Sequence, residues 1–65
     1  MIEHFEPGDS VLEVATSTAW TVLYFDAALR VATCERNDGY VNIVRALSAD
    51  DLEIMLPAEG RKLRA

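Results

Sequence analysis

Residues 19–25 set the strongest limit on the fold of this chain. The segment Ala19-Trp20-Thr21-Val22-Leu23-Tyr24-Phe25 is dense in β-branched and aromatic residues, which are enriched in strands. Strand side chains alternate between two faces. That alternation predicts two sets: Trp20, Val22 and Tyr24, and opposite them Thr21, Leu23 and Phe25. Because both sets are largely apolar, we expect a central or strongly bent strand.

The chain is long enough for one domain with one core. It has 65 residues, 51% of them hydrophobic, so it can bury enough surface to fold. Cys34 is the only cysteine, which rules out an intramolecular disulfide, and with a single histidine no zinc site made only of Cys and His can form within one chain. We therefore expect the domain to depend on tight packing or on self-association.

Four further strands are predicted around residues 19–25. Pro7-Gly8-Asp9 is a turn signal, and a first strand is expected from about Ser10. The polar connection Asn37-Asp38-Gly39 predicts a hairpin between strands at 30–36 and 40–45. Ser48-Ala49-Asp50-Asp51 predicts a short 3₁₀ turn before a last strand at 52–55.

A helical alternative exists for two segments. Asp26 could cap a helix over 26–37, and Ser48 with Asp51 matches a capping box, which together would give an α+β fold. The hairpin at 37–39 favours the strand interpretation, because it needs an antiparallel strand before it. With a strand there, Ala32 and Cys34 face one way and Val31 and Thr33 the other.

The resulting order of five short strands resembles a known family. The start Phe5-Glu6-Pro7-Gly8-Asp9-Ser10-Val11, the central hairpin and the turn before the last strand are similar to SH3-like barrels of the Tudor and KOW type and of several small bacterial proteins. The resemblance covers roughly residues 6–56. It implies a binding module that holds its partner on an aromatic-lined face or at a strand edge.

Domain limits and location follow from the remaining composition. We expect a single SH3-like domain over 1–56 and a flexible tail over 57–65, which begins with Pro57-Ala58-Glu59-Gly60. The most apolar stretch, 19–34, is interrupted by Asp26 and Arg30, so no membrane span is predicted. A lone thiol and an acidic N-terminus favour the cytoplasm.

Charge argues against direct binding of nucleic acid. Residues 1–59 hold all 11 acids and only three arginines, a net charge of −8, while Arg61, Lys62 and Arg64 bring the total to −5. Affinity for DNA or RNA comes chiefly from basic groups that release counterions. The acidic body is therefore expected to avoid nucleic acids.

The sequence offers no convincing catalytic, metal or cofactor site. His4 is read as a solvated side chain and Cys34 as a buried structural thiol, since it lies beside Glu35 and has no second cysteine nearby. Asp50 and Asp51 are read as turn caps. Phosphate-binding loops, nucleophile elbows and metal-ligand clusters are missing from the sequence. We therefore predict that the protein is not an enzyme.

Two functional hypotheses remain. The first is a non-catalytic module for a protein or peptide, with a basic partner and homo-oligomer formation as further options. Its expected anchors are aromatic and its steering residues acidic: Trp20, Tyr24 and Tyr40, with Asp38, Asp50 and Asp51. Trp20 could instead fill the core, and the strand edges at 41–44 or 52–55 could accept another chain. The second hypothesis is an acidic decoy that occupies the basic site of a nucleic-acid-binding protein.

Overall fold

The computed structural model describes residues 4–58 and is all-β. It contains five strands and one 3₁₀ turn: β1 (Ser10–Glu13), β2 (Thr18–Asp26), β3 (Val31–Asn37), β4 (Asn42–Ser48), η1 (Ala49–Asp51) and β5 (Leu52–Leu56). The strand prediction for residues 30–36 is confirmed, and the helix at 26–37 is wrong. The local sequence pattern at 26–37 is compatible with a helix or a strand. The segment forms a strand because β3 pairs with β2 on one side and with β4 on the other.

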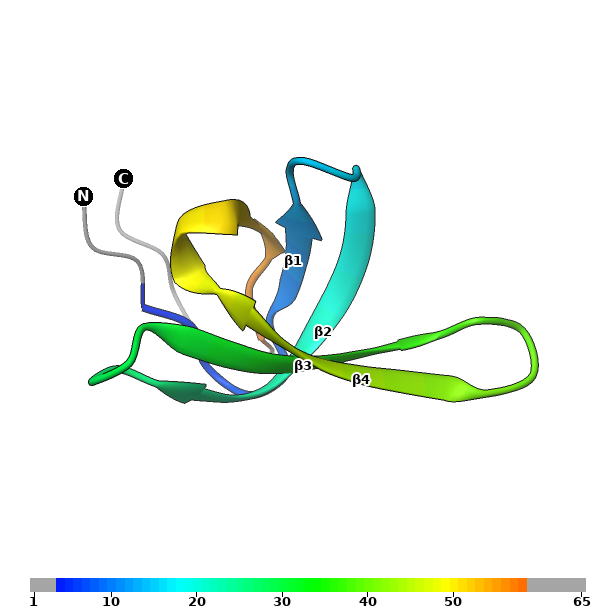
Figure 1. Ribbon diagram of the computed structural model, residues 1–65, viewed down its shortest axis with the longest axis horizontal. Coiled ribbons are helices and arrows are strands. Elements are labelled where there is room, and N and C mark those ends of the chain that lie inside the picture. Colours follow the sequence, from blue (N-terminus) through cyan, green and yellow to red (C-terminus); the bar gives the residue numbers. More distant parts are fainter. Residues whose placement is uncertain (1–3, 59–65) are drawn as a thin grey trace.

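All five strands form one antiparallel sheet in the order β4-β3-β2-β1-β5 (Figure 1). In the described chain β4 and β5 are not paired with each other, so the sheet is open and has two edges. The predicted edge segments, 41–44 and 52–55, fall largely within these two strands. β4 and β5 are therefore the two border strands of the sheet.

Two turns place glycine where φ is positive, whereas the β1–β2 and β2–β3 connections have Ser17 and Arg30 at φ of 57° and 55°. Gly8 has a φ of 94° in the turn before β1, and Gly39 has a φ of 88° in the β3–β4 hairpin, values that glycine adopts without steric cost. The Gly8 N–H donates to the Val22 carbonyl at 2.8 Å, and the Val22 N–H donates to the Asp9 carbonyl at 2.8 Å. The Pro-Gly-Asp turn is therefore held against β2.

The core lies on one face of the sheet. Its buried members come from all parts of the fold: Phe5, Val11, Trp20, Val22, Ala32, Cys34, Ala49 and Leu52. Along β3 the buried residues are Ala32 and Cys34, while Val31 and Thr33 are only half-buried, as the alternation predicted. The core is thus built from every second residue of the strands, with Phe5 added from the segment before β1 and Ala49 from η1.

The predicted faces of β2 are wrong beyond Val22. The pairing of β2 with β3 steps from Val22↔Cys34 to Tyr24↔Thr33, so Leu23 is an extra residue in a β-bulge. One extra residue reverses the alternation. Consequently Tyr24 points out and is 59% exposed, whereas Phe25 packs against the core.

Candidate functional site

The β3–β4 hairpin extends away from the rest of the fold (Figure 1). Its strands pair in one unbroken register, from Val31↔Ser48 to Asn37↔Asn42. The loop between them is closed by a 2.8 Å hydrogen bond from the Asp38 N–H to the Val41 carbonyl. The regular pairing and the hydrogen-bonded loop show that the β3–β4 hairpin, which we call the arm, is an ordered element.

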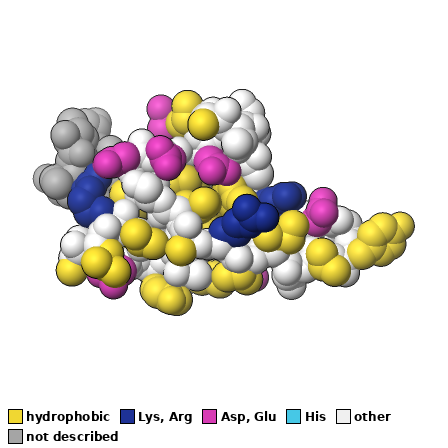
Figure 2. Space-filling model, viewed as in Figure 1, with side chains coloured by type: hydrophobic (Ala, Val, Ile, Leu, Met, Phe, Trp, Pro, Cys, Tyr) yellow, Lys and Arg dark blue, Asp and Glu magenta, His cyan; other side chains and the backbone are white. Residues whose placement is uncertain are grey.

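The tip of the arm presents apolar side chains on an ordered turn. Tyr40 is fully exposed and Val41 is 56% exposed, and Figure 2 shows hydrophobic atoms gathered at this end of the molecule. The Asn37 side chain fixes the turn beneath them. Its Oδ1 accepts from the Gly39 N–H at 2.8 Å, and its Nδ2 donates to Asn42 Oδ1 at 3.0 Å. Tyr40 is therefore displayed by a fixed backbone.

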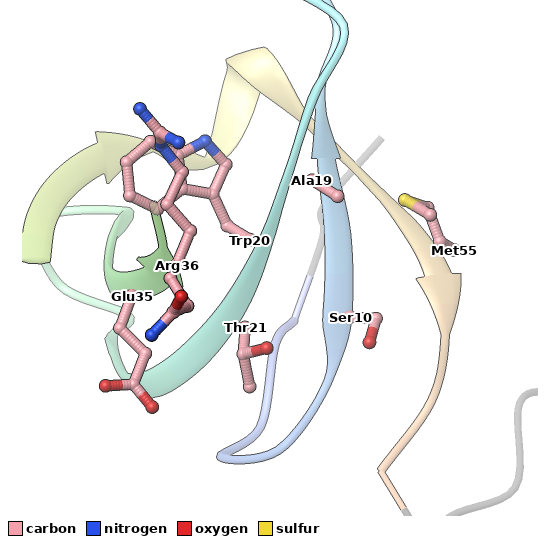
Figure 3. Close-up of a pocket in the computed structure, with 8 residues that line it drawn as sticks. Ser10, Ala19, Trp20, Thr21, Glu35, Arg36 and Met55 are labelled. Atoms are coloured by element: carbon pink, nitrogen blue, oxygen red, sulfur yellow. The ribbon is translucent and has the colours of Figure 1, made fainter. Parts of the chain in front are cut away.

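Trp20 belongs to the core instead of a binding groove. It is 5% exposed, and its Nε1–H donates to Glu13 Oε1 at 3.3 Å. The Arg36 guanidinium lies over the indole, with its Cζ 5.3 Å from the ring centroid. In Figure 3 the two side chains lie together on one side of β2. Arg36 thus covers the part of Trp20 that would otherwise meet solvent.

The three predicted aromatic anchors do not form one site. Trp20 is on the core face of β2, Tyr24 lies on the outer face beyond the bulge, and Tyr40 is at the hairpin tip. The bulge separates the first two, since without it they would share a face. Of the three, Tyr40 is the most accessible.

Two of the three predicted steering acids already have an arginine beside them. Asp50 Oδ1 lies 2.6 Å from Arg30 Nη2, and Asp38 Oδ1 lies 3.7 Å from Arg36 Nη1. Asp51 is exposed in the 3₁₀ turn η1, and its backbone carbonyl accepts from the Val14 N–H. Asp38 and the Asp50–Asp51 pair are at opposite ends of β4, so the acids form no single patch.

A shallow pocket of about 260 Å³ lies over the outer side of β2. In Figure 3 the labelled side chains of Ala19, Thr21 and Met55 lie across β2 from the Trp20 indole. Ser10, Glu35 and Asn37 complete its lining, together with parts of Trp20 and Arg36. Because the pocket is shallow, we assign it no ligand.

Cys34 is a fully buried thiol. Its Sγ is 3.7 Å from the Ala32 carbonyl, to which the S–H can donate. Burial, helped by the negative charge of Glu13, raises the pKa of Cys34 from 9.0 to about 11. Because the thiolate is the nucleophilic form, this thiol is a poor nucleophile near neutral pH.

Asp9 has a role that sequence reasoning missed. The side chain is completely buried, and its carboxylate accepts from the Glu6 N–H at 2.9 Å and from the Ala58 N–H at 2.8 Å. The Pro-Gly-Asp signal indicated only a turn. The bond to Ala58 ties the first residues of the predicted tail, 57–58, to the domain, while 59–65 lie outside the described residues.

Comparisons with known proteins found no relative of this chain. No protein-family model, curated protein or solved structure matches this chain. Within residues 4–58 there is no cluster of three or more His, Cys, Asp or Glu side chains suited to a metal ion. The same residues include no helix with the length and hydropathy needed to cross a membrane.

Proposed function

We propose that this protein is a non-catalytic interaction module that binds a protein or peptide along the edge of β4, with the hairpin tip as its anchor. The observation that carries the proposal is the position of β4, an unbulged seven-residue strand at the border of the sheet. An edge strand presents backbone N–H and C=O groups that another extended segment can pair with. Tyr40 and Val41 would add apolar contact beside that edge.

The two edges of the sheet differ in how well they are protected against pairing with another chain. Natural edge strands are guarded by shortness, bulges, charges or proline. β5 has five residues, carries Glu53, shifts its register against β1 and is followed by Pro57. On β4 the one charged residue is Arg45, and the register with β3 is regular throughout. This contrast supports β4 as the edge that takes a partner.

The fold family and location are part of the proposal. The strand order and the 3₁₀ turn before β5 support an SH3-like arrangement, although such folds serve many functions. The lone buried thiol of Cys34 supports a reducing compartment such as the cytoplasm. Binding of nucleic acid is not proposed, because the net charge is −5.

The anchor residues differ from those expected from the sequence. We propose Tyr40, Val41 and Val44 in place of Trp20 and Tyr24, since Val44 is 55% exposed on β4 itself. Asp38 and Asp50 would steer a basic partner only weakly, because each is partly neutralised by an arginine.

Capture from the source lysate with purified variants tests this function. Val44→Lys places a charge on the edge, and Tyr40→Ala removes the anchor; each is expected to reduce capture at least tenfold. Tyr24→Lys is the matched control, because Tyr24 is 59% exposed on the outer face of β2, which is separated from β4 by β3. Equal capture by all variants would refute the proposal. Retention only at low salt, insensitive to Val44→Lys, would favour the acidic decoy instead.

A further inference from the structure

We propose that the strand added to β4 is β4 of a second copy of this chain, antiparallel and related by a two-fold axis at Val44. This inference rests on the proposed function, because it names the occupant of the same edge. A domain of this size gains stability from association, since each copy covers exposed apolar surface of the other.

The outer face of β4 suits contact with its own copy. Residues paired in a sheet point to the same side, and Val44 pairs with Glu35 while Ala46 pairs with Thr33, on the side away from the core. The outward row of β4 is exposed and carries no charge: Asn42, Val44, Ala46 and Ser48. When β4 of a second copy pairs with this strand, no two charged side chains of the outward rows therefore lie opposite each other.

The single charge on β4 excludes one register. Arg45 pairs with Cys34, so it lies on the core side of the sheet. An axis at Arg45 would place two guanidinium groups directly opposite each other, which is destabilising. An axis at Val44 places each Arg45 opposite Ile43 of the other copy, and the outward row then meets as Val44 against Val44.

This register also covers the hairpin tip. In an antiparallel pair centred on Val44, Val41 of one copy lies level with Leu47 of the other, and Tyr40 lies level with Ser48. Val41 and Tyr40 are 56% and 100% exposed in the single chain. The arm that projects from one copy would thus lie along the body of the other, which gives its exposed apolar residues a partner.

Charge favours a second copy at this edge more than at β5. The chain has a net charge of −5, but β4 itself contains no acid, whereas β5 carries Glu53. Contact through β4 therefore keeps acidic residues out of the strand pair itself. Asp38 and Asp50 flank the two ends of β4, and the charge of each is partly offset by an arginine beside it.

Sedimentation analysis over a concentration series tests the inference. The wild-type chain is expected to be a dimer at high concentration, and Val44→Lys to weaken dimerisation at least tenfold with an unchanged circular dichroism spectrum. Tyr24→Lys is the matched control, because Tyr24 is 59% exposed on the outer face of β2 and away from the edge. A wild-type chain that stays monomeric throughout the series would overturn the inference.

A cysteine cross-link tests the axis. In a Cys34→Ser background, Val44→Cys places two thiols at directly opposed positions, where Cα atoms about 4.5–5.5 Å apart suit a disulfide. With oxidised glutathione as the electron acceptor, we expect rapid formation of a covalent dimer, and slow formation for Tyr24→Cys. Equal rates for the two variants would overturn the register.

Failure of the dimer can be told apart from failure of the proposed function. A monomeric wild-type chain whose lysate capture is lost in Val44→Lys would mean that the edge binds a different protein, so only the dimer would be wrong. A monomeric chain whose capture is unaffected by Val44→Lys would overturn both.

Discussion

The Ala58 backbone N–H donates a 2.8 Å hydrogen bond to Oδ1 of Asp9, and so joins the end of the described chain to the turn before β1. The two residues are 49 positions apart in the sequence. The other carboxylate oxygen of Asp9 accepts from the Glu6 N–H. One buried side chain therefore fixes the N-terminal turn and the segment after β5 at the same point.

Replacing Asp9 is expected to destabilise the fold. Asp9→Ala removes the acceptor for two part-buried backbone N–H groups, and each group left unsatisfied costs about 1–3 kcal/mol. Asp9→Asn keeps the shape but has one acceptor oxygen, so we expect a smaller loss of about 1–2 kcal/mol. Urea denaturation measures both. Asp51→Ala, on an exposed side chain, is the control, and equal effects at the two positions would contradict this role for Asp9.

Substitutions at Trp20 and Tyr40 are expected to have different effects. The first lowers the stability of the fold, and the second lowers partner binding. Trp20→Ala empties a buried site in the core and should cost about 3–5 kcal/mol of folding free energy. Tyr40→Ala changes a fully exposed side chain and should alter stability by no more than about 0.5 kcal/mol, while capture of the partner falls. Thermal or urea unfolding of both variants checks this. A stable Trp20→Ala variant would show that the indole is not a core element.

Alkaline pH should destabilise the protein through Cys34. The folded-state pKa of about 11 lies above the ordinary value of 9.0, so between these pH values the unfolded chain holds fewer protons than the folded one. Stability is therefore full below pH 9 and falls as the pH rises toward 11, by a few kcal/mol at most. Urea midpoints at pH 8, 9, 10 and 11 measure the loss. Cys34→Ala should show a smaller fall, because other groups that titrate in this range are shared by both proteins.

Modification of Cys34 offers an independent check on its burial. We expect iodoacetamide to react at pH 7.5 far more slowly with the folded chain than with the chain in urea, because the thiol is buried and neutral. Mass spectrometry of quenched time points follows the reaction. Equal rates in the two states would indicate that the thiol is accessible, and would reopen a redox role.

Local patterns in the sequence were enough for most of the strands. Asn37-Asp38-Gly39 predicted a hairpin, and the hairpin in turn predicted β3, because an antiparallel partner must precede it. The alternation along β3 then placed Ala32 and Cys34 in the core. These inferences succeeded because turn chemistry and strand period act over a few residues.

Two features depend on contacts that the sequence does not show. The bulge at Leu23 arises where β2 curves while paired with β3, and it reversed the faces predicted for Tyr24 and Phe25. The link between Asp9 and Ala58 joins distant segments, so a turn signal could not reveal it. The expectation that Trp20 and Tyr24 share one face was wrong for the first of these reasons.

Amide hydrogen exchange along β4 tests the interaction edge most directly. Strand addition pairs backbone amides that the isolated domain leaves open, so exchange in residues 40–48 should slow when the captured partner is added or when the chain is concentrated enough to associate. The β5 residues, 52–56, serve as the internal control and should keep their rates. New protection confined to β4 and the hairpin tip is the predicted result. Protection at β5 with none at β4, or binding without any change in residues 40–48, would contradict the proposal.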